Sequence, residues 1–190
     1  MEMMGLFYFV FFIFWATTTS LWPTTVKQFS LKSLTETAVT VAWVHCDNTT
    51  PALIDGELYT NYEFTVIETI KGLQTPKIRL SLPGGNFQGQ RYQIVGMPIF
   101  STGTYELLFL THAAPKRSAW PIGLYQGAAR IIRDKNGVDY VFFRQKPHVT
   151  KTLIPSKLTV MGQNKKYDGT PLSNVLTHIR SLMSDQSNEY

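Results

Sequence analysis

The chain of 190 residues contains a single cysteine, Cys46, so it cannot form an intramolecular disulfide. Cys46 follows a strand-like run, residues 39–45, and its direct neighbour is His45. Adjacent residues on a strand point to opposite faces, which argues against a paired Cys-His nucleophile. We therefore interpret Cys46 as a structural free thiol, with pairing to a second chain as the alternative.

Motifs for catalysis and metal binding are also missing. The four histidines are isolated, and the chain has no His-Glu-x-x-His or Cys-x-x-Cys pattern that would hold zinc. It also lacks a Gly-x-Ser-x-Gly elbow and a phosphate-binding loop. We therefore predict no catalytic residue, no metal and no cofactor, and we expect a binding or structural module, not an enzyme.

The longest apolar run is too short to span a bilayer. Residues 5–16 are almost wholly apolar, whereas a membrane-spanning helix needs about 20 such residues. Small residues, Thr17 to Ser20, follow the run, which is typical of a secretory signal, although the segment before it carries Glu2 and no Lys or Arg. We predict a signal peptide over residues 1–20, a secreted or periplasmic protein and no transmembrane span after cleavage. An uncleaved anchor reaching Trp22 is the alternative.

Positive charge exceeds negative charge but is not concentrated. The formal net charge is +5, and the only adjacent basic pairs are Lys116-Arg117 and Lys165-Lys166. No basic helix or aromatic ribonucleoprotein motif accompanies them, so we predict no specific binding of nucleic acid. A solvated surface explains the charges, and attraction to anionic envelope components is the alternative.

Period-two alternation predicts several strands between Tyr59 and Leu110, the first of them over residues 62–70. Further strand-like runs cover residues 77–82, 91–95 and 105–110, and four strands in this length predict an antiparallel meander. The first strand places four apolar residues on one face, with a bend expected near Glu68: Tyr62, Phe64, Val66 and Ile70. Upstream, the strand before Cys46 is expected to end at the turn-forming pair Asp47-Asn48.

Glycine marks two predicted turns. Gly84 and Gly85 open the glycine-rich connection 83–89 between two strands, after Pro83, which cannot donate to a ladder. Asn136-Gly137 separates the strand-like runs 128–133 and 138–143, which is the strongest local signal for a hairpin with a type I′ turn.

Two helices are predicted, one before the first strand and one near the end of the chain. Residues 30–36 form a short helix that either Ser30 or Ser33 caps. After an irregular connection over residues 144–167, Thr170 and Pro171 resemble an N-cap and a first helical residue. An apolar stripe at helical spacing then predicts an amphipathic helix, 171–183, that docks on the sheet. Binding to a membrane surface is its alternative role.

These elements predict one mainly β (β+α) domain over residues 21–190. We expect an antiparallel OB-like or barrel-like meander with a short N-terminal helix and a C-terminal amphipathic helix. Loops on such a scaffold commonly carry contacts. Phe87, Arg91 and Trp120 are residue types that are enriched at binding hot spots, so we predict that they bind the partner. The alternative for Phe87 and Trp120 is a place in the core.

The order of the motifs resembles that of a family of secreted bacterial β-domains, and the likeness covers residues 30–183. The family combines a Pro-Gly-Gly turn, a Gly-x-Pro segment and a Leu-Phe-Leu strand, found here as 83–85, 96–98 and 108–110. It is distantly similar to the OB-like netrin module of metalloprotease inhibitors. This chain lacks the cysteine framework of that module, so the resemblance implies no inhibitory wedge and assigns no functional residue.

The function expected from the sequence is that of an exported, non-catalytic module that contacts a macromolecular partner. The partner is an unknown protein, such as a secreted protease or an envelope component. A protease-regulating or enzyme accessory domain and a basic module for envelope or membrane-surface attachment are the alternatives.

Overall fold

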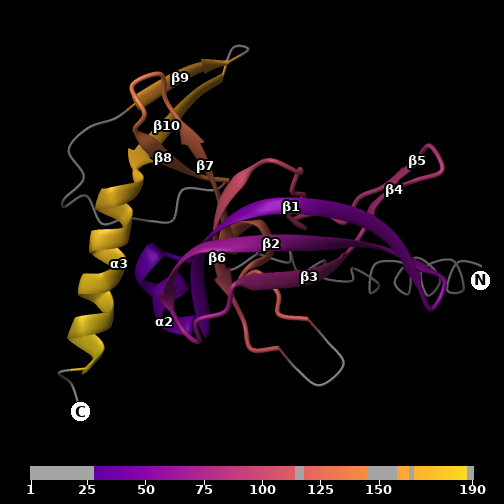
Figure 1. Ribbon diagram of the computed structural model, residues 1–190, viewed down its shortest axis with the longest axis horizontal. Helices are drawn as coiled ribbons and strands as arrows, with labels where there is room; N and C mark the ends of the chain where they lie inside the picture. The colour runs from indigo at the N-terminus through magenta and orange to yellow at the C-terminus, as the bar shows by residue number, and fades with distance from the viewer. Residues whose placement is uncertain (1–27, 114–117, 145–157, 163–164, 188–190) are drawn as a thin grey trace, which may run out of the picture.

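The computed structural model describes residues 28–113, 118–144, 158–162 and 165–187, so the predicted signal peptide lies outside the described residues. Figure 1 shows a strand-rich molecule with a long helix, α3, at one end and two narrow strand pairs at the other. The elements are, in chain order, α2 (Leu31–Thr37), β1 (Thr40–Ile54), β2 (Glu57–Lys71), β3 (Lys77–Pro83), β4 (Gly85–Phe87), β5 (Gln90–Tyr92), β6 (Tyr105–Leu110), the 3₁₀ turn η1 (Leu124–Gly127), β7 (Ala128–Arg133), β8 (Asp139–Phe143), β9 (Leu158–Gly162), β10 (Lys165–Pro171) and α3 (Leu172–Ser187).

One antiparallel sheet has the strand order β3-β2-β1-β6-β7-β8-β10-β9, and β4 and β5 form a separate two-stranded sheet. This confirms the predicted mainly β class with antiparallel strands, a short first helix and a C-terminal helix. The sheet is open, with β3 and β9 as the edges of its described part, so these strands do not close a barrel.

The chain path differs from the simple meander that we expected over residues 59–110. After β3 the chain returns across the sheet, and β6 pairs with β1, from Thr40 opposite Leu110 to His45 opposite Tyr105. The arrangement of β6, β1, β2 and β3 is a Greek key. β1 suits an interior position because its apolar residues face both sides of the sheet, and Val41 and Val44 are both fully buried.

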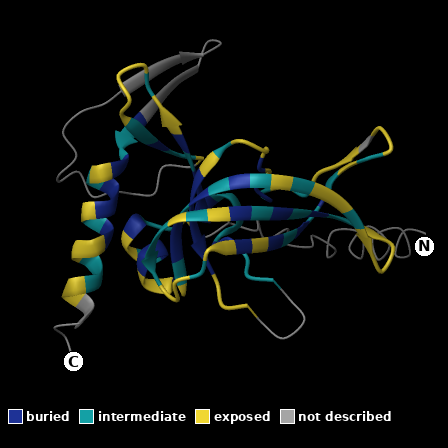
Figure 2. Ribbon diagram, viewed as in Figure 1, coloured by how far each residue is buried: buried dark blue, intermediate teal, exposed yellow. Residues whose placement is uncertain are grey.

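The two faces of the sheet carry separate cores. On one face, α2 and α3 cover a cluster that includes Leu34, Phe109 and Ile179. On the other face, the connections before β6 and before β7 cover a cluster that includes Phe64 and Phe100. Figure 2 shows the buried positions alternating along the strands and forming a stripe on α3. The C-terminal helix therefore docks on the sheet through its apolar stripe.

An extra residue in β2 changes the face on which its later side chains lie. Val44 pairs with Val66 and Trp43 pairs with Glu68, which leaves Ile67 without a register partner. One inserted residue reverses the alternation, so Glu68 lies on the helix side of the sheet, where it forms an ion pair with Arg180 of α3. The prediction that Ile70 shares a face with Tyr62 was wrong for this reason, because Ile70 packs against the helix-side cluster.

A second register shift lies at Asp47, where we predicted a turn. β1 continues to Ile54, because Cys46 pairs with Phe64 and Asn48 pairs with Glu63, so Asp47 is the extra residue of a bulge. Its carboxylate accepts a hydrogen bond from Thr65 Oγ1 at 2.6 Å and lies 2.8 Å from His45 Nδ1. These two contacts, that of Thr65 first, lower the pKa of Asp47. Local sequence correctly indicated an irregularity but not its type.

The helix ends and the segment before α3 also differ in part from the predictions. Ser30 is the N-cap of α2, since its hydroxyl oxygen accepts a hydrogen bond from Ser33 N. Pro171 is the last residue of β10, opposite Tyr140, so α3 begins one residue later than we expected. The expected irregular connection, residues 144–167, contains β9 and the first residues of β10, which pair with each other as a hairpin.

The β7–β8 hairpin occurs where Asn136-Gly137 predicted it, but with a different turn. Gly137 has φ of 82°, and Asn136 is not among the described residues with positive φ, whereas a type I′ turn needs both. Gly137 N donates to Asp134 O at 3.1 Å, and Asp134 Oδ1 accepts from Asn136 N and Val138 N. This is a type I turn followed by a left-handed glycine, with Asp134 stabilising the loop.

We expect Gly137→Val to lower the free energy of unfolding by about 1 kcal/mol or more, because a β-branched residue is strained at positive φ. A Cβ atom at this position would meet nothing within 4 Å, so the cost is purely conformational. Chemical denaturation of wild type, of Gly137→Val and of the control Lys135→Ala, which lies in the same exposed turn, measures the effect. Equal stability of these three proteins would contradict the described turn.

Leu176→Ala on α3 should cost about 2 to 5 kcal/mol, because the side chain is 6% exposed in the helix-side core. Thr177→Ala, on the exposed side of the same helix, is the matched control. Unfolding curves of the two variants decide the point, and a Leu176 effect no larger than that of Thr177 would mean that α3 does not pack as described.

Candidate functional site

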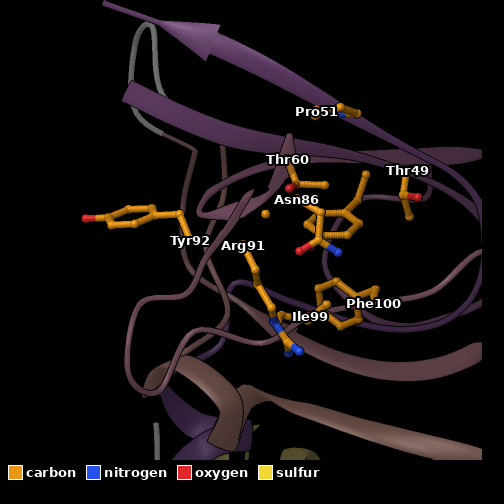
Figure 3. Close-up of a pocket in the computed structure, with 10 residues that line it drawn as sticks. Thr49, Pro51, Thr60, Asn86, Arg91, Tyr92, Ile99 and Phe100 are labelled. Carbon is orange, nitrogen blue, oxygen red and sulfur yellow. The ribbon is translucent and has the colours of Figure 1, made fainter. Parts of the chain in front are cut away.

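A pocket of about 160 Å³ lies where three segments meet (Figure 3). One wall is the ribbon, which we define as residues 48–62 of the β1–β2 hairpin. The second wall is the arm, residues 85–92, formed by β4 and β5. The third wall is the connection that precedes β6, through Ile99 and Phe100. The β1–β2 hairpin, the β4–β5 pair and the connection before β6 thus build one concave site.

The ribbon wall depends on the bulge at Asp47. Beyond the bulge, Thr49 lies opposite Tyr62 and Pro51 lies opposite Thr60, and all four residues line the pocket. Without the extra residue, the alternation of β1 would turn Thr49 and Pro51 to the other face. The bulge therefore sets which side chains of β1 form the site.

Two glycines allow the arm to approach the ribbon closely. Gly84 and Gly85 have φ of 100° and 144°. A Cβ atom on Gly85 would lie 2.2 Å from Thr60 Oγ1, and one on Gly84 would lie 2.9 Å from Tyr92 O. Because both residues are glycines, the two backbones come close enough for Thr60 Oγ1 to donate to Gly84 O at 2.7 Å and for Gly84 N to donate to Leu58 O at 2.8 Å. These contacts join the base of the arm to the ribbon.

The arm supplies the charged group of the pocket. The run expected as a strand over residues 91–95 contributes only its first part to β5, where Arg91 pairs with Asn86 of β4. Figure 3 shows the Arg91 side chain extending toward Ile99 and Phe100, whereas the ring of Tyr92 points away from the cavity. Arg91, Asn86 and Tyr92 are all exposed.

The three predicted partner residues do not gather at this pocket. Arg91 lines it. Phe87 is half-buried in the arm and is not a lining residue. Trp120 is half-buried and packs against the core on the face opposite the helices, and its backbone N–H donates to Thr111 Oγ1 at 3.1 Å. Of the three, Arg91 is therefore the residue that the pocket contains.

Behind the pocket lies a polar pair, a buried carboxylate and a partly exposed guanidinium, that the sequence did not indicate. Arg144, after β8, donates to Ile99 O at 2.9 Å, and its guanidinium lies 5.7 Å from the centre of the Phe100 ring. It also lies 4.0 Å from Glu106 Oε1, whose side chain is fully buried. Arg144 thus connects β8 with the third wall of the pocket.

Glu106 lies in an unusual environment for a carboxylate. Burial raises its pKa to about 7, and Arg144, Arg130 and the hydroxyl of Thr104 partly offset that rise. Thr104 Oγ1 lies 3.3 Å from Glu106 Oε1, while Oε2 has no hydrogen-bond partner in the described structure. The available sequence signal was one acidic residue within the otherwise apolar run 105–110, which we interpreted only as a central strand.

Cys46 is buried on the same side of the sheet as this pair. Burial is the main cause that raises the pKa of its thiol to about 11, with smaller contributions from Glu106 and Asp47. The thiol is therefore protonated at neutral pH, and a thiol without solvent access reacts poorly. The neighbouring His45 lies by Asp47 and against the ring of Tyr105, 4.8 Å between ring centroids.

No family model, curated protein or solved structure matches the chain, so the family resemblance stays a prediction. The described residues contain no group of three or more His, Cys, Asp or Glu side chains that could hold a metal ion. Among the helices that the structure describes, none is long and apolar enough to cross a membrane.

Glu106→Gln should change how stability depends on pH. The glutamate ionises near 4.5 in the unfolded chain and near 7 in the folded protein, so the folded state binds more protons between these values. The contribution of Glu106 to the free energy of unfolding therefore falls by about 3 kcal/mol in total as pH rises from 4.5 to 7. Above pH 7 this contribution stays at its low value.

Urea unfolding of wild type and Glu106→Gln between about pH 5 and pH 8 tests this linkage. We expect the variant to gain stability relative to wild type as pH rises. Glu63→Gln, which removes a carboxylate from an exposed ion pair with Arg79, is the control. A Glu106→Gln difference that does not change with pH would contradict the assignment.

Proposed function

We propose that this protein is a non-catalytic binding module that holds a segment of a protein partner at the pocket between the ribbon and the arm. The size of the pocket carries this proposal. A volume of about 160 Å³ is close to the roughly 150 Å³ of a cavity that holds benzene. Sites for drug-sized ligands and cofactors usually span about 300–1,000 Å³. The pocket therefore suits one side chain, and the rest of such a ligand must lie outside it.

The surroundings of the pocket support contact with a large partner. Five of the lining residues are exposed and form its rim: Pro51, Asn86, Arg91, Tyr92 and Ile99. Tyrosine and arginine are enriched at the centres of protein interfaces, where a few residues supply most of the binding energy. A side chain in the pocket with its flanking residues on this rim is the arrangement that we propose.

Strand addition at β3 is a less suitable mode of binding. Ser118 Oγ accepts from Ser81 N at 3.0 Å and donates to Ser81 O at 3.2 Å, so it occupies the two backbone groups of Ser81 in the middle of the outer edge of β3. A peptide that extends the sheet needs such edge groups to be free. The pocket is therefore the better candidate.

The remaining parts of the proposal come from the sequence. The apolar run before Thr17 supports an exported protein, so we propose that the partner is a secreted protease or a protein of the envelope. Attachment to a membrane through α3 is disfavoured, because the apolar stripe of α3 packs against the sheet.

Selection of peptides from a random displayed library on the wild-type protein tests the function. We expect binders whose affinity falls on the order of tenfold when Tyr92 or Ile99 of the rim is replaced by Ala. Leu73→Ala, which removes an apolar side chain that is 88% exposed away from the pocket, is the matched control and should leave the affinity unchanged. Peptides that bind both rim variants as well as wild type, or a failure to select any, would contradict the proposal.

A further inference from the structure

We propose that the pocket binds a carboxylate of the partner, from an Asp or Glu side chain or from the end of a chain. This inference rests on the proposed function and adds the chemical class of the group that the pocket takes. Its basis is an unpaired positive charge in a small site that has room for little else.

The charge of the pocket comes from Arg91 alone. None of the residues that line the pocket is acidic, and Arg91 forms no ion pair with any residue that the structure describes. The other charged groups behind the pocket, Arg144 and Glu106, lie 4.0 Å from each other. A guanidinium presents its N–H donors in a planar fork that matches the two oxygens of a carboxylate.

Asn86 supplies a second donor beside the guanidinium. It lies opposite Arg91 in the β4–β5 register, so the two side chains project from the same face of the arm. Both line the pocket, and within the described chain the amide of Asn86 has no hydrogen-bond partner. Thr60, on the ribbon wall, already donates its hydroxyl proton to Gly84 O. The donors that remain for a ligand are thus the two groups on the arm and the hydroxyl of Thr49 on the ribbon wall.

The apolar part of the pocket fits the stem of an acidic side chain. Ile99 and the buried ring of Phe100 face the end of the Arg91 side chain in Figure 3. One or two methylene groups would contact these residues while the carboxylate meets Arg91. A single guanidinium matches the single charge of a carboxylate, and a doubly charged phosphate would leave charge uncompensated.

Amide shifts of the ¹⁵N-labelled protein, at low salt, measure the binding of short probes. The first probe is a pentapeptide with a central Glu between alanines and with both ends blocked, compared with the same peptide carrying Gln. The second pair is penta-alanine with a free or an amidated C-terminus. We expect saturable shifts at Asn86, Arg91 and Phe100 with a carboxylate probe, and affinity lower by about tenfold or more for its neutral counterpart.

Arg91→Gln should remove the preference for the carboxylate by the same factor. Arg79→Gln, which removes an exposed arginine paired with Glu63 outside the pocket, should leave the preference unchanged. The two probe pairs distinguish a side-chain carboxylate from a chain end. Equal binding of charged and neutral probes, no saturable shift at the pocket, or an equal loss in both arginine variants would overturn the inference.

The result also separates this inference from the proposed function. If displayed peptides depend on Tyr92 and Ile99 but not on Arg91 or on an acidic residue, the binding function stands and the carboxylate inference is wrong. If carboxylate probes bind at Arg91 but no displayed peptide does, the pocket takes carboxylates and the proposed protein partner is wrong.

Discussion

The register of β1 against β2 is the constraint on which the rest of the molecule depends. Side chains alternate along a strand, so one extra residue moves all later side chains to the other face. At Asp47 this places Thr49 in the pocket although Cys46, three residues earlier, lies in the core on that same side. At Ile67 it turns Glu68 toward α3. These two of the three register shifts let one strand pair serve two cores and a binding site.

The bulge at Asp47 is stabilised by its own side chain. A bulged residue interrupts the ladder, and its backbone loses the regular pairing of its neighbours. The Asp47 carboxylate contacts Thr65 on the partner strand and His45 on its own strand, which holds both strands on either side of the insertion. The same residue type that indicated a turn in the sequence thus joins two strands in the fold, because a short acidic side chain satisfies local donors in either setting.

Local pattern predicted the strands well and their arrangement poorly. Runs such as 77–82 and 105–110 show clear alternation, and alternation depends only on neighbouring residues. The return of β6 to β1 depends on contacts between residues 60 to 70 positions apart, from His45 with Tyr105 to Thr40 with Leu110, for which the run 105–110 carries no local signal. Similarly, Arg91 was recognised by residue type, but the approach of the arm to the ribbon depends on Gly84 and Gly85 meeting Thr60, a contact across the fold.

The pair of Glu106 and Arg144 illustrates the same limit and has a structural consequence. Burying the Glu106 carboxylate costs free energy that its attraction to the partly exposed Arg144 only partly offsets, and an apolar residue in place of a buried charge is often as stable. An apolar residue at position 144, however, could not donate to Ile99 O, so the third wall of the pocket would lose its hydrogen bond to the end of β8. Glu106 in turn is the acidic residue that pairs with the Arg144 guanidinium in the described structure. The pair therefore exchanges some stability for a defined position of Ile99 and Phe100, which is what a pocket that accepts one side chain requires.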